Sequence, residues 1–314
     1  MPRDFAETVG RTVEGEAMKL SRILSLVEAA VDPSQKLSYD TPDSTTDLKI
    51  QLVEAFEQNC SDAMYMVEHN VPFYRGTKND RVRTFAIIDP TQTERRSQSG
   101  ADGNFYTLFL DNHPDRADWP KRKNSTIATT DHEFVENFGP HTLVVIPFND
   151  VKIGSTGTHD IWDNSIKWPF HTPYGTSLPD VNNMWARFVN DVITPASQHT
   201  PGLPVPTDND WNSWNELHVA LQKKTAREWA TTDGAFDPAA HSGKFRIFLE
   251  TILTDGLLPT IRHMYSNDNL RPTQTTFTTS AEFVEVKGEV WVGGKSLVMT
   301  KAAWRLLRRH YGFD

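Results

Sequence analysis

The order of hydrophobic and polar residues divides the start of the chain into two helices and a loop. Residues 17–32 and 45–70 repeat their apolar side chains every three or four positions, as an amphipathic helix does. Thr46 or Asp47 is expected to cap the second helix, because a short side-chain oxygen can accept hydrogen bonds from the first turn. The polar residues 33–44 between the two helices contain two prolines and predict a loop.

The pattern then changes to short runs of β-branched and aromatic residues. Residues 84–90, 126–130 and 141–148 are bounded by Pro, Asp or Asn, which is typical of strands. Between the last two runs, residues 131–139 have room for little more than one short amphipathic helix, which Gly139 would end. This part of the chain is therefore expected to form a sheet with short connections.

Helical periodicity dominates again from residue 175 to residue 270. A strand pattern returns at residues 276–294, which end in paired glycines, and an apolar and basic helical stretch follows. Residues 194–210 carry four prolines and predict a linker. The strongest helical segments are residues 180–193, 211–230 and 244–265.

Composition and charge narrow the possible functions. Of the 314 residues, 32 are Lys or Arg and 41 are Asp or Glu, and the net charge of −9 argues against broad binding to nucleic acid or acidic membranes. The single cysteine, Cys60, excludes a disulfide framework and a cysteine-rich zinc site. We expect neither a secretion signal nor a membrane span, because no long apolar run is present.

Metal sites and the common nucleotide-binding loops find no support in the sequence. Residues 208–219 begin like a calcium loop, but Ser213 takes the place of the turn glycine and Val219 that of the final glutamate. We expect a helix start there instead. The residues His132, His159, Asp160 and Asp163 lack a compact metal-ligand spacing, and no Rossmann or Walker loop occurs.

Three separated motifs resemble those of the ADP-ribosyltransferase superfamily, in the branch marked by an arginine, a Ser-Thr-Ser strand and a glutamate. The first is FYRG at residues 73–76, and the second covers residues 124–148, a hydroxyl-rich strand followed by a short helix and an apolar strand. The third is KGEVWVGGKSLVM at residues 287–299. The chain has Ala128, Thr129 and Thr130 where the family has Ser-Thr-Ser, and Lys287 two residues before Glu289, where many relatives have Glu or Gln.

The resemblance implies that NAD is the substrate and assigns roles to individual residues. Arg75 would hold the pyrophosphate through two parallel hydrogen bonds, beside Tyr74, Gly76 and Ser125. Glu289 would stabilise the positive charge that builds on the ribose as nicotinamide leaves, as in glycoside hydrolysis. The alternative acid is Asp160, which lies closer in sequence to the hydroxyl strand. The positioning hydroxyl would be that of Thr129 or Thr130, with Ser125 and Thr126 as further hydroxyls just upstream.

The sequence therefore predicts an α+β protein with a split, mainly antiparallel β-core of ADP-ribosyltransferase type. We expect an N-terminal helical segment at residues 1–70, a first part of the core at 71–174, a helical insertion at 175–270, and the last core strands with a C-terminal helix at 271–314. Residues 118–124 form either a solvated loop or a basic rim that attracts an anion.

The layout FYRG, RRSQSGADGNFYTLFLDNHP, PKRKNSTIATTD and DIW also resembles proteins encoded by tailed bacteriophages. Together the two resemblances imply transfer of ADP-ribose from NAD to a macromolecular acceptor, a host protein, in the cytoplasm of an infected bacterium or from the virion. Neither a metal, nor a membrane, nor a nucleic acid is expected to take part. The alternative is a catalytically inactive virion or interaction protein that keeps the same fold as a scaffold.

Overall fold

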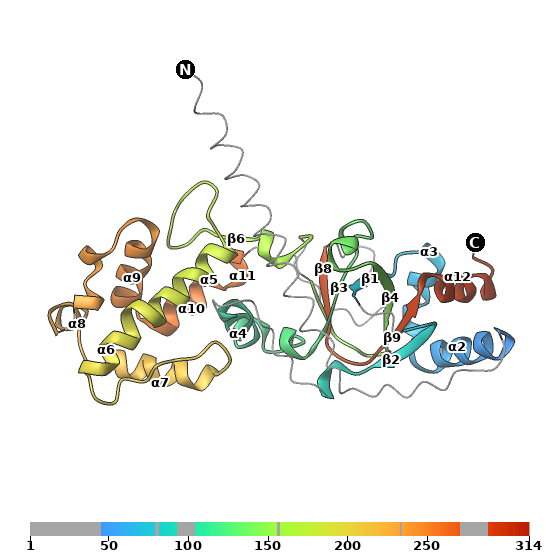
Figure 1. Ribbon diagram of the computed structural model, residues 1–314, viewed down its shortest axis with the longest axis horizontal. Helices are drawn as coiled ribbons and strands as arrows, with labels where there is room; N and C mark the ends of the chain where they lie inside the picture. Colours follow the sequence, from blue (N-terminus) through green and yellow to red (C-terminus); the bar gives the residue numbers. More distant parts are fainter. Residues whose placement is uncertain are drawn as a thin grey trace, which may run out of the picture. The chain divides into compact units, whose positions relative to one another are not determined.

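The computed structural model divides the chain into two compact units (Figure 1), and each is described by itself. The first unit takes the described residues of the ranges 1–100, 120–159 and 274–314, and the second those of 101–119 and 160–273. The structure describes residues 45–78, 82–92, 104–155, 158–232, 234–270 and 288–313. The predicted helix at 17–32, the loop at 33–44, Lys287 and most of the strand pattern at 276–294 lie outside these residues.

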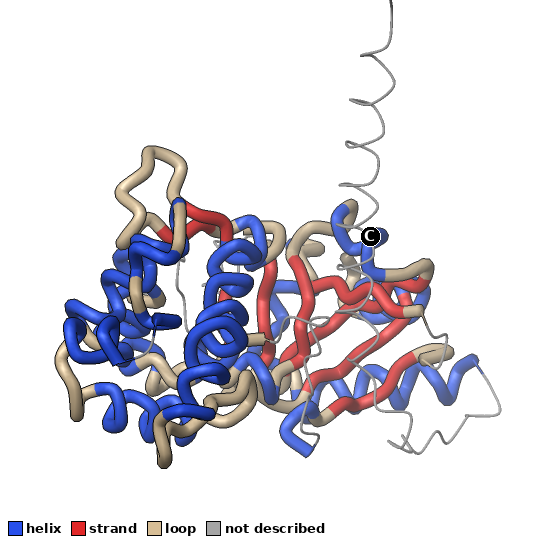
Figure 2. The backbone as a smooth tube through the Cα atoms, turned by 60° about the vertical axis from the view of Figure 1, so that its left-hand side comes forward, coloured by secondary structure: helices blue, strands red, loops and turns tan. Residues whose placement is uncertain are grey.

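The first unit is built on an antiparallel sheet whose strands come from three distant parts of the chain (Figure 2). Its order among the described residues is β2-β9-β4-β1-β3-β8-β5. Each predicted strand run that is described forms a strand, and the α+β class is confirmed. The strands are β1 (Phe73–Thr77), β2 (Phe85–Ile88), β3 (Thr126–Thr129), β4 (His141–Pro147), β5 (Ile153–Ser155), β8 (Glu289–Val292) and β9 (Ser296–Thr300).

The two strands made last insert between strands made earlier. Strand β8 lies between β3 and β5, and β9 lies between β4 and β2. Both strands are apolar and buried, as is expected of strands with a partner on each side and a covered face. Among the described residues, the edge strands β2 and β5 therefore join the sheet only through residues 289–300, which follow them by more than a hundred positions, whereas β4, β1 and β3 pair with one another directly.

Helices pack against this sheet and bury its apolar side chains. Helix α12 (Lys301–His310) contacts β4, β9, α2 (Thr45–Asn59) and α3 (Met64–His69). The predicted helix at 45–70 is broken near Cys60 by a 3₁₀ turn. Since α2 begins at Thr45, Thr46 and Asp47 lie inside its first turn and not ahead of it. The turn near Cys60 is η1 (Ser61–Ala63), and the further 3₁₀ turns of this unit are η2 (Pro90–Gln92), η4 (Arg122–Asn124) and η5 (Phe134–Phe138).

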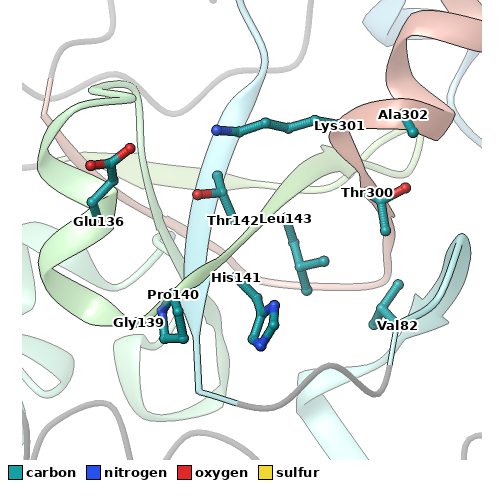
Figure 3. Close-up of a pocket in the computed structure, with 10 residues that line it drawn as sticks. All are labelled: Val82, Glu136, Gly139, Pro140, His141, Thr142, Leu143, Thr300, Lys301 and Ala302. Carbon is teal, nitrogen blue, oxygen red and sulfur yellow. The ribbon is translucent and has the colours of Figure 1, made fainter.

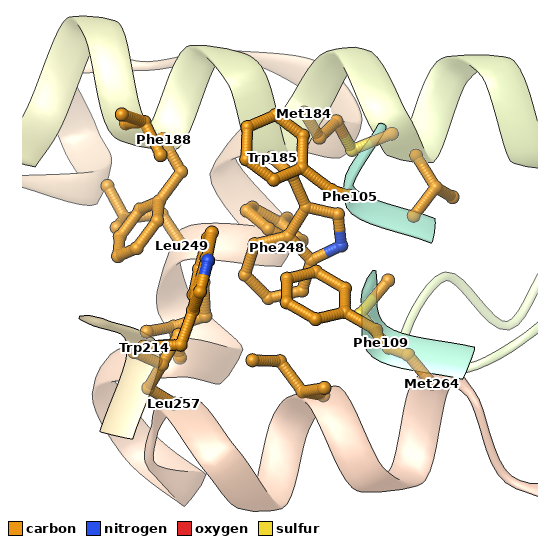
Figure 4. Packing of buried hydrophobic residues seen from close by; sticks show 14 of the residues in the cluster. Phe105, Phe109, Met184, Trp185, Phe188, Trp214, Phe248, Leu249, Leu257 and Met264 are labelled. Carbon is orange, nitrogen blue, oxygen red and sulfur yellow. The ribbon is translucent and has the colours of Figure 1, made fainter. Parts of the chain in front are cut away.

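The second unit is a cluster of helices around an aromatic core (Figure 4). The ring of Phe109 lies 4.9 Å from that of Trp185, 4.8 Å from that of Trp214 and 5.3 Å from that of Tyr265. Its elements are α4 (Phe105–Asp111), α5 (Leu178–Arg187), α6 (Thr194–His199), α7 (Trp211–Leu221), α8 (Ala226–Thr232), α9 (Gly243–Asp255), α10 (Leu257–Met264), α11 (Asn267–Leu270), β6 (Ser165–Ile166), β7 (Thr176–Ser177), the 3₁₀ turns η3 (Pro114–Arg116), η6 (Ile161–Asp163), η8 (Gly234–Phe236) and η9 (Pro238–Ala240), and the π turn η7 (Phe188–Ile193).

This unit is larger than the helical insertion expected at residues 175–270, because it also takes residues 101–119 and 160–174. Every residue of α4 is buried, and the rings of Phe105 and Phe109 both pack on Trp214. The sequence pattern could not assign α4 to this unit, because an apolar stretch of seven residues is equally suited to either core.

The predicted linker at 194–210 was wrong, since this stretch is part of the second unit. It starts with α6, which continues α5 through the π turn η7. Its remaining residues are fixed by side chains: Trp214 Nε1 donates to the Thr207 carbonyl at 2.7 Å, and Asp208 accepts from the Asn104 N–H at 2.9 Å. The helix expected to start in residues 208–219 is confirmed as α7, which Asp210 caps by accepting from the Asn212 N–H.

Candidate active site

The strands that carry the three motifs are neighbours in the sheet. Strand β1 contains FYRG, β3 contains the hydroxyl-rich motif, and β8 begins with Glu289. Tyr74 is directly opposite Thr129, and Thr129 is directly opposite Glu289. Because opposed residues of antiparallel strands point to the same face, the side chains of Tyr74, Thr129 and Glu289 form one row across three strands. We call these three residues the Tyr-Thr-Glu row.

The turn η5 covers the β1 end of this face. The Tyr74 ring meets the His132 ring edge-on at 4.9 Å. Gly76, two residues beyond Tyr74 and on the same side, has no space for a Cβ atom because the Val135 carbonyl and the Phe138 side chain lie against it. Burial raises the pKa of the Tyr74 hydroxyl, which keeps it neutral at physiological pH.

Glu289 is almost fully buried, with 6% of its surface exposed, and it is paired with Arg122. Both Nε and Nη2 of Arg122 donate to Oε1 of Glu289, at 3.1 and 2.8 Å. The loop that carries Arg122 is fixed at two further points, because Trp291 Nε1 donates to the Pro120 carbonyl at 3.0 Å and Ser125 Oγ donates to the Lys121 carbonyl at 2.7 Å. The guanidinium therefore holds the carboxylate in one orientation.

The backbone around Glu289 is fixed as closely as its side chain. Thr130 Oγ1 accepts from the Gly288 N–H at 2.7 Å, and the Thr158 carbonyl accepts from the Glu289 N–H at 2.6 Å. Gly288 has a φ of +88°, and a Cβ atom there would collide with the Thr158 backbone. Only glycine fits this position, since both its conformation and its surroundings exclude a side chain.

The hydroxyls predicted to position the reactants have different partners. Thr129 Oγ1 accepts from the Asp131 N–H at 3.0 Å, and accepting one bond leaves its own proton available for donation. Thr130 acts on the backbone next to Glu289, and Ser125 acts on its own loop. Thr129 is therefore the predicted hydroxyl whose register places it beside Glu289.

Arg75 is not brought to the face of the Tyr-Thr-Glu row. It follows Tyr74 on β1, so strand alternation turns its side chain to the opposite face, where it is partly buried. Its Nη1 donates to the Ile127 carbonyl at 3.0 Å. Burial lowers the pKa of the guanidinium to about 10, so it stays protonated at neutral pH.

The alternative acid, Asp160, belongs to the second unit. It is buried, and its Oδ1 accepts from the Trp162 N–H at 3.0 Å, which caps η6. A capping carboxylate of this kind satisfies a free N–H group of a turn. This role explains the residue type at Asp160 by local structure.

Three functional candidates were not assigned from the sequence: Arg122, Asp131 and His159. Arg122 lies in the basic stretch 118–124, whose proximity to the hydroxyl strand was a usable signal, but no pattern paired it with Glu289. Asp131 Oδ2 and His159 Nδ1 lie 2.9 Å apart, although Asp131 precedes β4 in the chain and His159 follows β5. Only the fold makes that contact visible.

A hollow of about 710 Å³ lies on the first unit (Figure 3). It is formed by η5, the start of β4 and the start of α12, and none of the three row residues lines it. Lys301 and His141 supply its nitrogen atoms, and Glu136 a carboxylate, so its lining has mixed charge. This mixture does not favour one class of ligand.

Comparisons with known proteins identify no relative. No family model, curated protein or solved structure matches the chain. Among the described residues, no group of three or more His, Cys, Asp or Glu side chains could hold a metal ion, and no helix has the length and apolar character to cross a membrane. A function must therefore be inferred from the Tyr-Thr-Glu row and its surroundings.

Proposed function

We propose that the protein transfers ADP-ribose from NAD to a macromolecular acceptor, a host protein during bacteriophage infection. One observation carries this proposal: the three predicted motifs, far apart in the sequence, occupy three adjacent strands, with Tyr74, Thr129 and Glu289 in one row. Thr129 and Glu289 are also buried, so the fold encloses the polar end of the row. The register also places a hydroxyl directly opposite the carboxylate.

The residues of the row suit the chemistry of NAD cleavage. When the bond between ribose and nicotinamide breaks, its electron pair leaves with the nicotinamide, and positive charge develops on the sugar. The carboxylate of Glu289 stabilises this charge and accepts a hydrogen bond from a ribose hydroxyl. Thr129 orients the pair, and the partly buried Tyr74 ring offers an apolar surface.

Arg122 contributes by holding the carboxylate in one place before the substrate arrives. A charge held in place inside a dry site stabilises a transition state without costly reorganisation. The two hydrogen bonds from Arg122 go to Oε1, so the pair has a defined geometry. Arg122 is thus a positioning residue for Glu289.

The role predicted for Arg75 needs a separate test, because its side chain lies on the other face of β1. If Arg75 holds the pyrophosphate, Arg75→Lys should weaken NAD binding by about 1.5–3 kcal/mol, the scale of a charged hydrogen bond. Calorimetric titration measures this difference. Equal NAD affinity of the wild type and the variant would exclude Arg75 from the site. Its role would then be structural, through the hydrogen bond to the Ile127 carbonyl of β3.

The alternative is a catalytically inactive virion or interaction protein, and two observations favour it. Arg122 already neutralises the charge of Glu289, and Ala128 provides no hydroxyl at the first position of the hydroxyl motif. In that case the row is a set of structural contacts, and the fold acts as a scaffold. Saturable binding of NAD separates the two functions.

The deciding experiment measures nicotinamide release and labelling of host proteins by labelled NAD. Glu289→Gln should leave NAD affinity nearly unchanged and lower turnover by roughly a hundredfold or more, because the lost interaction strengthens in the transition state. Asp160→Asn is the matched control, a buried carboxylate changed to an amide that can still cap η6. A large loss in Asp160→Asn alone would transfer the catalytic role to Asp160. Absence of nicotinamide release by the wild type would reject the proposal that the protein is an enzyme.

A further inference from the structure

Asp131 and His159 form a pair beside the backbone of Glu289. Asp131 follows Thr130, whose hydroxyl accepts from the Gly288 N–H, and His159 follows Thr158, whose carbonyl accepts from the Glu289 N–H. The two side chains then meet, with 2.9 Å between His159 Nδ1 and Asp131 Oδ2. Each member of the pair therefore follows a residue that hydrogen-bonds the backbone of Gly288 or Glu289, at the start of β8.

The contacts of Asp131 determine which nitrogen of His159 carries the proton. Its Oδ1 accepts from the backbone N–H groups of Glu133 and Phe134, at 2.9 and 3.1 Å, which fixes the carboxylate. An ionised carboxylate can only accept, so Nδ1 of His159 must be the donor. The neutral ring then carries its lone pair on Nε2, the form in which histidine takes up a proton.

The pair lies on the same face of the sheet as the Tyr-Thr-Glu row. The Phe134 ring of η5 lies 5.8 Å from the His159 ring, and η5 covers the face to which Tyr74 and Gly76 point. The side chain of His159 is 64% exposed, whereas that of Glu289 is 8% exposed. A macromolecule that cannot reach the buried carboxylate can therefore reach the imidazole.

We propose that His159 is the general base that activates the acceptor, with Asp131 as its positioning residue. An acceptor O–H group attacks C1′ of the ribose, the new C–O bond forms, and the bond to nicotinamide breaks. The electron pair of the broken bond leaves with nicotinamide, and the acceptor proton passes to Nε2 of His159. This inference rests on the proposed transfer of ADP-ribose.

The need for a base also defines the class of acceptor. A carboxylate acceptor is already deprotonated at neutral pH and would gain nothing from His159. A side-chain hydroxyl must lose its proton during attack, and a positioned imidazole contributes roughly 10²–10⁴-fold to such a step. A general base therefore favours an acceptor that must lose a proton, and we propose a hydroxyl-bearing side chain of a protein, with water as its competitor.

The test compares His159→Gln and Asp131→Asn with His141→Gln, an exposed histidine of the same unit that lines the hollow. Transfer turnover should fall roughly a hundredfold or more in the first two variants and stay within twofold in the control, while the KM for NAD stays unchanged. The acid side of the wild-type pH profile should disappear in His159→Gln, because imidazole protonation no longer limits the rate.

Asp131→Asn adds a readout that does not depend on activity. Its amide oxygen can still accept from the Glu133 and Phe134 N–H groups, but its NH₂ group donates to His159 and should move the ring proton to Nε2. Nitrogen NMR of the imidazole measures this change of tautomer. A wild-type ring already protonated on Nε2, or unchanged turnover in His159→Gln, would contradict the role of His159 as the general base. If the wild type itself releases no nicotinamide, the proposed function fails and the base fails with it.

Discussion

The two units bury different kinds of side chain, and the contrast indicates where chemistry can occur. The second unit fills its interior with aromatic rings, such as those of Phe109, Trp185 and Trp214, which pack edge to face. The first unit buries an ion pair, Arg122 with Glu289, next to the hydroxyl of Thr129. An aromatic core stabilises without further requirements, whereas a buried charge is costly unless its partners are in place.

Buried charge of this kind seldom improves stability over an apolar core of the same shape. Its presence at the start of β8 therefore calls for another explanation, and the proposed catalysis supplies one. Sequences depart from the rules of a stable core chiefly at functional positions. The second unit also buries the charged residues Asp111, Arg116 and Asp160, but aromatic rings dominate its core, so we expect it to govern stability and the first unit to govern turnover.

The largest expected effect lies in the aromatic core. Phe109→Ala should lower the free energy of unfolding by about 3–5 kcal/mol, because it removes a fully buried ring and leaves a cavity. Denaturant titration followed by tryptophan fluorescence measures the loss. Tyr174→Ala, at a ring that is 90% exposed, is the control and should change the value by less than about 0.5 kcal/mol. A loss of unfolding free energy below about 1 kcal/mol in Phe109→Ala would contradict the expectation that the aromatic core of the second unit governs stability.

The ion pair of the first unit should show strong coupling. Glu289→Gln should lower the free energy of unfolding by about 3 kcal/mol, because the buried guanidinium of Arg122 loses its counter-charge. The double change Glu289→Gln with Arg122→Met should cost less than the sum of the single changes, because it no longer leaves an isolated buried charge. A double-mutant cycle of unfolding free energies gives the coupling. Additive single costs would show that the pair is not a unit.

A smaller effect is expected at the turn before β8. Gly288→Ala should destabilise by about 2 kcal/mol, because the new Cβ meets the Thr158 backbone in addition to the strain of a positive φ. Gly312→Ala is the matched control, since Gly312 has a φ of +82° and nothing within 4 Å of the added Cβ. Equal costs for the two variants would mean that the contact with Thr158 contributes nothing.

The smallest effect concerns pH and the second unit. Burial lowers the pKa of His113, whose Nδ1 accepts from the Asp115 N–H at 3.1 Å. A lowered folded-state pKa means that the unfolded chain binds the proton more readily, so stability is full above about pH 6.5 and falls as the pH drops below it. The slope for one such group is at most about 1.4 kcal/mol per pH unit. His113→Gln should flatten the curve, and an unchanged slope would exclude His113 as its source.

The sequence predicted the elements of the first unit better than it predicted their partners. Strands β3 and β4 were identifiable because alternation and β-branched residues are local signals. The row of Tyr74, Thr129 and Glu289 needed register, which no local pattern encodes, and only the assumption of a family resemblance suggested that the motifs meet.

The same limit explains the residues that were not assigned. Arg122 and Glu289 come together because β8 pairs with β3. Asp131 meets His159 because the residues before them, Thr130 and Thr158, hydrogen-bond the adjacent N–H groups of Gly288 and Glu289. Solvation of Arg122 was as consistent with its sequence as burial was. Arg75 shows the reverse case, since its motif was visible but the pleat of β1 turns it away from the row.

The late insertion of β8 and β9 has a consequence for synthesis on the ribosome. Among the described residues, the edge strands β2 and β5 each pair with a single strand, β9 and β8 respectively. Both therefore lack a partner until residues 289–300 have been translated, after the whole of the second unit. During this interval the nascent chain exposes apolar strand edges that can pair with other chains. Slow elongation or loss of these last two strands should thus produce aggregation of the first unit, while the second unit has already folded.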